Sequence, residues 1–129
     1  RVGDSLTRRF RADEMTRRRR LDGALAGLFR RFALATECKV VLDRIFGAAA
    51  LDSVSSVGLR DCRLSHAGKV RFVGEFLDSE YRELIGRYRH APGVSMVRRL
   101  ECALAERHAT WSLTSLLVLV ARAKRVMGR

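Results

Sequence analysis

Proline, lysine and cysteine are scarce in this chain of 129 residues. There is one proline, Pro92, and there are three lysines beside 23 arginines. Few helix breakers and many good helix formers predict an all-α fold of about five or six helices, built as a small bundle or a stack of helix–turn–helix hairpins. The cysteines Cys38, Cys62 and Cys102 are far apart and odd in number, so we expect no disulfide framework and a reducing compartment.

Long apolar runs and catalytic motifs are also missing. The longest strongly apolar stretch, "LLVLV" at residues 116–120, is far shorter than the roughly 20 residues of a membrane span. The sequence contains no phosphate-binding loop, no dinucleotide-binding glycine pattern, no zinc-protease motif and no serine-nucleophile motif. We therefore expect a chain that is not an enzyme, spans no membrane, takes no small-molecule substrate and uses neither a metal nor another cofactor.

Two groups of residues could in principle bind a metal or act in catalysis. Cys62 and His66 are four residues apart, but a structural zinc site needs four ligands and no second pair follows. A hydrolase or transferase would have to combine Cys62, His66 and Glu75, which their spacing does not favour. The acidic residues between Glu75 and Glu83 are more typical of helix-start charge and internal ion pairs than of acid–base catalysis.

Positive charge is abundant and unevenly placed. The net charge is +12. Residues 1–36 contain ten basic and four acidic side chains, residues 37–80 contain six and seven, and residues 81–129 contain ten and three. Two basic ends around a neutral middle predict two anion-facing surfaces, and nucleic acid is the commonest polyanionic partner. A GC-rich coding sequence would also enrich arginine, so composition alone leaves both explanations open.

The run "RRRR" at residues 17–20 precedes an apolar stripe. Successive helical residues point about 100° apart, so these arginines cannot all face one surface. Irregular folded RNA suits such a ring better than duplex grooves do. The predicted RNA-binding residues are Arg8, Arg9, Arg11, Arg17, Arg18, Arg19, Arg20, Arg98, Arg99, Arg122, Lys124 and Arg125.

Apolar spacing predicts one helical domain over residues 1–129, in which residues 1–20 are a basic extension or helix start. Residues 12–34 are expected to form one long helix with an apolar stripe, and the next helix would end at Gly47. The stripe consists of Leu21, Leu25, Leu28, Phe29 and Phe32. Residues 51–68 read as an irregular connector, and residues 69–77 as a helix with a strand as the alternative. The expected inner faces of the last three helices are Tyr81, Leu84, Ile85 and Tyr88; Val97, Leu100 and Leu104; and Leu113, Leu116, Leu117, Val120 and Met127.

Residues 79–127 resemble pentatricopeptide-like helix–turn–helix repeats. "YRELIGRY" and "LTSLLVLVARAK" would be successive first helices, with Tyr81 aligned to Leu113 at a spacing of 32 residues. This resemblance implies a stack of α-hairpins. The arginine-rich, lysine-poor, helical style is also similar to that of lineage-specific mitochondrial ribosomal proteins of the kinetoplastid type, which implies contact with ribosomal or other structured RNA and with neighbouring proteins.

These observations lead to an expected function as a structural, RNA-contacting component of a large ribonucleoprotein, a mitochondrial ribosome or its assembly intermediate. Because the chain begins at Arg1 rather than Met, we expect a presequence that was removed or lies outside the sequence, and hence a mitochondrial matrix location. The nucleus and the cytoplasm are the alternative locations. The alternative function is a matrix-side accessory subunit or interaction module that binds acidic proteins or a membrane complex.

Overall fold

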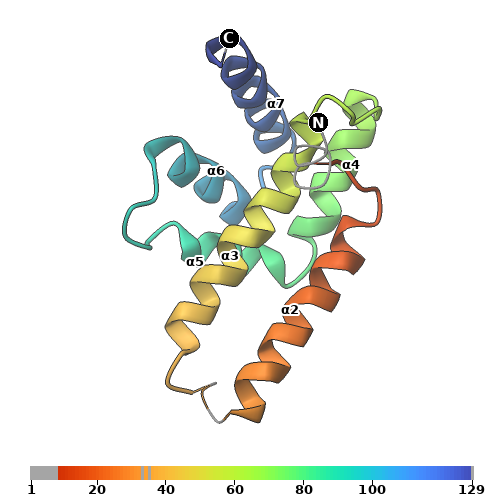
Figure 1. The fold of residues 1–129 in the computed structure, drawn as a ribbon. Coiled ribbons are helices and arrows are strands. Elements are labelled where there is room, and N and C mark those ends of the chain that lie inside the picture. Colours follow the sequence, from red (N-terminus) through yellow and green to blue (C-terminus); the bar gives the residue numbers. More distant parts are fainter. Residues whose placement is uncertain (1–8, 33, 35, 129) are drawn as a thin grey trace.

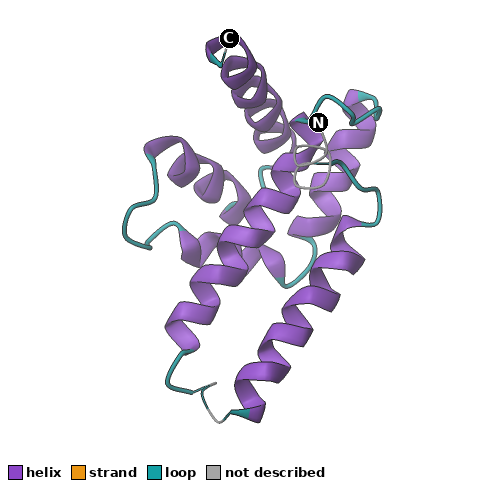
Figure 2. Ribbon diagram, viewed as in Figure 1, coloured by secondary structure: helices purple, strands orange, loops and turns teal. Residues whose placement is uncertain are grey.

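The residues whose positions are described form six α-helices and one short 3-10 helix, and they contain no strand. The computed structural model describes residues 9–32, 34 and 36–128. The helices are α2 (Glu14–Arg31), α3 (Lys39–Ser55), η1 (Ser56–Gly58), α4 (His66–Leu77), α5 (Tyr81–Tyr88), α6 (Met96–Glu106) and α7 (Thr110–Met127). The all-α prediction is confirmed (Figure 2), as is a helix rather than a strand at residues 69–77.

Helices α2 and α3 form a long antiparallel hairpin, and the other helices gather around the C-terminal half of α3 (Figure 1). Helices α5 and α6 lie on one side of α3, and α4 lies on the other. Helix α7 packs on η1, α4 and α6, and its last turns project past them. The distal end of the hairpin, where α2 passes into α3, extends beyond the remaining helices.

The apolar core lies where α3 to α7 converge. Its largest fully buried side chains include Leu51 of α3, Phe76 of α4, and Tyr81 and Ile85 of α5. Leu84 and Tyr88 pack against the core from its edge, so the expected inner face of α5 is confirmed. Helix α2 differs from the other helices because its only buried residue is an acid, Glu14.

Helix α3 is longer than the sequence predicts. Gly47 does not end it but lies buried against α5, where an added Cβ would be 2.7 Å from the carbonyl oxygen of Leu84. The glycine therefore serves close helix packing rather than termination. The predicted irregular connector is also partly wrong, because α3 continues to Ser55 and α4 already begins at His66. The Ser55 hydroxyl donates to the carbonyl of Leu51, which satisfies it inside the helix.

Two predicted inner faces need correction. Helix α6 buries Glu101, Cys102 and Ala105. Of its predicted inner face, Leu104 packs against the core as expected, whereas Val97 and Leu100 are about half exposed. In α7, Leu113 and Leu117 are buried as expected, but Met127 is 85% exposed because the last turns extend past the helices beneath them.

Candidate nucleic-acid interface

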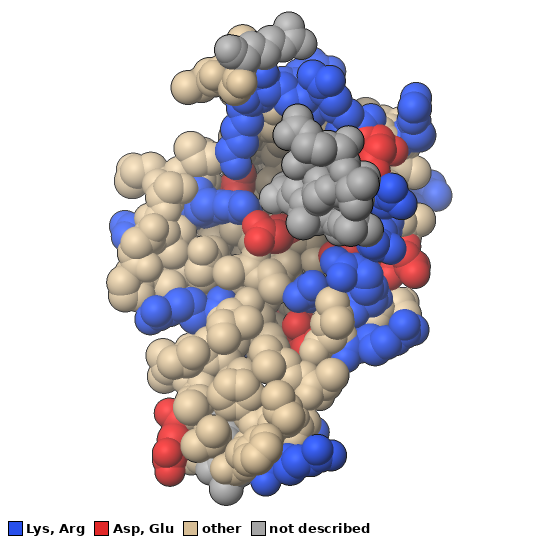
Figure 3. Space-filling model, in the orientation of Figure 1, with Lys and Arg blue, Asp and Glu red and all other residues tan. Residues whose placement is uncertain are grey.

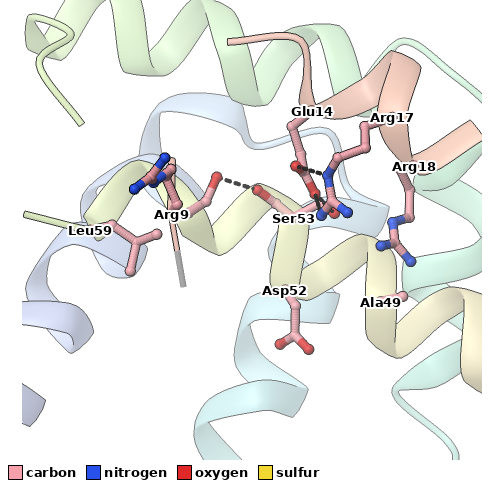
Figure 4. Close-up of a pocket in the computed structure, with 9 residues that line it drawn as sticks. Arg9, Glu14, Arg17, Arg18, Ala49, Asp52, Ser53 and Leu59 are labelled. Carbon is pink, nitrogen blue, oxygen red and sulfur yellow. Dashed lines mark hydrogen bonds and ion pairs between the residues drawn. The ribbon is translucent and has the colours of Figure 1, made fainter. Parts of the chain in front are cut away.

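The arginine run lies in the first turns of α2, and its first member, Arg17, is partly exposed and pairs with a buried acid. Arg17 donates from Nε and Nη2 to the two carboxylate oxygens of Glu14, at 3.0 and 3.1 Å. Glu14 also accepts a hydrogen bond from the Ser53 hydroxyl of α3 (Figure 4). A buried carboxylate needs such partners to offset its desolvation. Arg17 therefore helps to attach α2 to α3.

Arg18 is also directed inward. It pairs with Asp22 at 3.4 Å, and Asp22 accepts a hydrogen bond from the Tyr81 hydroxyl. Burial raises the pKa of Asp22, and the nearby Arg18 opposes that rise. Burial likewise raises the pKa of the Tyr81 hydroxyl. This group joins the start of α2 to α5 through polar contacts.

Arg19 makes the third internal contact of the run. Its guanidinium donates to both carboxylate oxygens of Glu80, at 3.0 and 2.8 Å. The hydrogen bond from Arg19 lowers the pKa of Glu80, and the same bond raises the pKa of Arg19. Arg19 and Arg20 are both exposed, and Arg20 alone in the run makes no ion pair or hydrogen bond with another described residue. Three of the four arginines thus form structural contacts within the chain.

A polar hollow of about 180 Å³ opens beside this end of α2. Arg17 and Arg18 line it together with Glu14, Ser53 and Asp52, and Arg9 lies at its other side, next to Leu59 (Figure 4). The carboxylates compensate much of the arginine charge here. Arg18 Nε is buried without a hydrogen-bond partner among the described residues. The hollow is therefore lined by both acidic and basic side chains. Among its arginines, Arg9 is the one that pairs with no acid in the described part of the chain.

Arg98 of α6 is likewise held within the fold. Its guanidinium lies 2.7 Å from the carboxylate of Asp52 and 3.4 Å from that of Glu101, and it donates to the Ser55 hydroxyl. Burial raises the pKa of Glu101, and Arg98 partly offsets that rise. Arg98 thus compensates a buried acid, which is a structural role.

The basic N-terminal and C-terminal segments meet at η1. Arg125 of α7 donates to the carbonyl oxygen of Gly58 at 2.8 Å. Lys124 lines a small cleft with Leu59, and Leu59 also lines the hollow beside Arg9. Figure 3 shows basic side chains over the end of α7 and along the start of α2. The sequence predicted two separate basic surfaces, whereas the structure brings members of both ends around one segment.

We call Arg9, Lys124 and Arg125, together with Arg122, which lies one turn before Arg125 on α7, the η1 basic patch. Arg9, Arg122 and Lys124 are exposed and form no ion pair or hydrogen bond with another residue that the structure describes. Arg125 is partly buried, and its contact with Gly58 positions the end of α7. These side chains are available to phosphates, which arginine and lysine bind through charged hydrogen bonds.

The other predicted RNA-binding residues are dispersed. Arg8 lies outside the described residues. Arg11 is exposed just before α2, and Arg99 is exposed on the outward side of α6. The structure therefore brings together part of the predicted set at η1, assigns Arg17, Arg18, Arg19 and Arg98 to internal contacts, and leaves Arg20 and Arg99 as separate exposed charges.

The remaining candidates do not form a catalytic arrangement in the described part of the chain. Cys62 is buried in a loop, whereas His66 is exposed at the first position of α4, with Trp111 edge-on to its ring. The described residues contain no group of three or more potential metal-ligating side chains placed to hold an ion. None of the described helices is long and apolar enough to cross a membrane.

Comparison with known proteins gives no relative. No protein family matches the chain, and no match is found among curated proteins or solved structures. The two segments that resemble first helices of pentatricopeptide-like repeats form α5 and α7, which are 8 and 18 residues long. The observed geometry and charge must therefore support any functional inference.

Proposed function

We propose that this chain is a non-enzymatic, RNA-contacting structural component of a large ribonucleoprotein, and that the particle is a mitochondrial ribosome or its assembly intermediate in the mitochondrial matrix. The observation that carries the proposal is the η1 basic patch. It collects exposed cations from both ends of a chain with a net charge of +12. Phosphates would neutralise charges that lack partners among the described residues.

The mechanism assigns different roles to different arginines. Arg19 links α2 to Glu80, just before α5, and Arg98 links α6 to Asp52 of α3, whereas Arg17 pairs with Glu14 within α2. The η1 basic patch then presents its cations on a rigid helical support. Contacts of this kind bind phosphate oxygens and carry little sequence information. We therefore expect RNA affinity that falls steeply with salt and depends little on sequence.

A salt titration with matched variants tests this role. The triple variant Arg9→Gln, Arg122→Gln, Lys124→Gln removes three exposed charges from the η1 basic patch. For a structured RNA, the slope of log affinity against log salt should become shallower by about two to three, and affinity should fall roughly tenfold or more. The control variant Arg20→Gln, Arg99→Gln, Arg107→Gln removes three exposed charges elsewhere and should have a smaller effect. A flat slope for the unmodified chain, or equal losses in both variants, would contradict the proposal.

Sedimentation of the native protein tests the particle. We expect it to migrate with a ribosomal subunit or a precursor, and to shift to lighter fractions after nuclease treatment. The alternative role is an accessory subunit or interaction module that binds acidic proteins or a membrane complex. In that case the protein would remain with its partners after nuclease treatment, and migration as a free small protein would remove the proposed particle.

A further inference from the structure

The distal part of the α2–α3 hairpin exposes a large apolar surface. Five side chains, which we call the apolar hairpin face, are each 42 to 63% exposed. They are Leu21, Leu28, Phe32, Val41 and Ile45. Isolated exposed apolar residues are common, but a contiguous group of large ones marks an interaction site.

Helix geometry places these residues on two adjoining stripes. At about 100° per residue, Leu21, Leu28 and Phe32 lie within roughly 40° of one another around α2, as do Val41 and Ile45 around α3. Helix α5 covers a different side of α3, at Gly47. Figure 3 shows a broad surface without charge over the lower part of the hairpin. The two stripes therefore form one open surface between two helices.

Unpaired positive charge borders this surface. Arg20 and Arg31 lie on α2 and Arg44 lies on α3, and all three are exposed. Within the described residues, none of them forms an ion pair. Around α2, the two arginines lie roughly 60 to 120° from the apolar stripe, on one side of it. The surface thus offers an apolar centre with arginines along both helices, and the exposed acid Glu37 lies in the connection between the two helices.

We propose that the apolar hairpin face docks an amphipathic helix of a partner protein, whose apolar stripe is flanked by Asp or Glu. Such a helix would complete a three-helix arrangement, because two neighbouring helices offer a groove for a third. The rise from Leu21 to Phe32 is about 16 Å, which matches three helical turns. The carboxylates would pair with Arg20, Arg31 and Arg44 at the edge.

The bordering charge argues against two other occupants. A second copy of this chain would bring like arginine edges together across an isologous contact, which is unfavourable. Phosphate oxygens of RNA would gain nothing from the apolar centre. The acidic helix is the occupant that satisfies both the apolar and the charged part, and it is independent of RNA binding at η1.

Two synthetic helical peptides of 18 residues test the proposal. Both carry the same leucine stripe, one flanked by Glu and the other by Lys, and binding to the full chain is measured by fluorescence anisotropy. We expect the Glu peptide to bind at least tenfold more tightly than the Lys peptide. The variant Arg20→Glu, Arg31→Glu, Arg44→Glu should reverse that order.

Serine substitutions test whether peptide binding depends on the apolar hairpin face or on exposed apolar residues elsewhere. Phe32→Ser with Val41→Ser should weaken binding of the Glu peptide at least tenfold, with an unchanged helical circular dichroism spectrum because both residues are exposed. The matched control, Met96→Ser with Leu119→Ser, replaces two exposed apolar residues of α6 and α7 and should bind as the unmodified chain does.

Several outcomes would overturn the proposal. The proposal would be overturned if the Glu peptide did not bind, or if both peptides bound equally well. It would also be overturned if the control variant lost as much affinity for the Glu peptide as the hairpin variant does. A dimer in sedimentation equilibrium that Phe32→Ser with Val41→Ser abolishes would replace the acidic helix with a second copy. RNA affinity should be unchanged in that variant, so failure here leaves the RNA titration as a separate result.

Discussion

The arginine run of α2 and the η1 basic patch contain the same kind of side chain in opposite situations. Arg17 and Arg19 each make two hydrogen bonds to a carboxylate of their own chain. Arg122 and Lys124 extend from the end of α7 without such partners among the described residues. The difference shows that the densest cluster of charge in a sequence can stabilise the fold, while sparser charges form the surface available to an anion.

The same comparison extends along the hairpin. Near η1, α2 is attached to α3 by the buried contact between Glu14 and Ser53. At the distal end, Phe32 is 63% exposed and Val41 is 51% exposed. Polar contacts are internal at one end and apolar side chains are external at the other, which is the reverse of a self-contained helical hairpin. The distal end therefore has the character of an interface.

The largest stability effect is expected at the attachment of α2. Glu14→Ala removes the acceptor of both Arg17 and Ser53, and Ser53 is buried. Loss of a buried charged partner should lower the free energy of unfolding by about 2 to 3 kcal/mol. Urea unfolding measures this loss. A change below about 0.5 kcal/mol would show that the contact does not attach α2.

Arg19→Gln should have a smaller effect than Glu14→Ala. Arg19 and Glu80 are each about half exposed, so water screens their attraction and the pair contributes about 0.2 to 1 kcal/mol. Urea unfolding in low and high salt should show that the difference shrinks as salt rises. If RNA affinity fell more for Arg19→Gln than for Arg122→Gln, the arginine run would be an RNA contact after all.

Stability should depend on pH through Glu101. Its folded-state pKa is raised, chiefly by burial, so the folded state keeps the proton to higher pH than the unfolded state does. The free energy of unfolding should therefore fall as pH rises from about 4.5 through the folded-state pKa. Urea unfolding across this window should show the fall in the unmodified chain and a smaller fall in Glu101→Gln, because Asp22 also has a raised pKa and keeps its own contribution.

A substitution of Arg98 provides a second test of this pH dependence. Arg98 opposes the rise in the pKa of Glu101. In Arg98→Gln, the pH range over which the free energy of unfolding falls should therefore extend to higher pH. An unchanged window would contradict the structural role given to Arg98. The control Arg99→Gln alters the neighbouring exposed arginine and should leave the window in place.

The smallest stability effect is expected for the η1 basic patch. Arg9, Arg122 and Lys124 are exposed, so their joint replacement by Gln should change the free energy of unfolding by less than about 0.5 kcal/mol. Relief of mutual repulsion can make the change slightly stabilising. A large loss in urea unfolding would mean that these residues support the fold rather than present charge.

Local signals made much of the fold predictable. The apolar spacing of α5 identified Tyr81 and Ile85 as core residues, and that of α7 identified Leu113 and Leu117. The end of α3 was missed because Gly47 is used for contact with a helix about 40 residues later in the chain. Packing between distant segments decides such positions, and a short stretch of sequence does not encode it.

The situation of each arginine was harder to predict. Arg17 and Arg18 pair with acids three and four residues away, a spacing that is readable from the sequence. Arg19 and Arg98 pair with Glu80 and Asp52, and no local pattern reveals these contacts. The apolar stripe of α2 was predicted, but periodicity does not distinguish a face covered within the chain from one left for a partner.

Cross-linking of RNA to the native protein tests the central claim most directly. After ultraviolet irradiation of the isolated particle, digestion with a protease that does not cut at arginine would allow mass spectrometry to locate the nucleotide adducts. We predict adducts near Arg9 and on the last turns of α7, and none on the apolar hairpin face. Adducts concentrated at Leu21 to Ile45, or none on the chain, would contradict the assignment of RNA contact to η1.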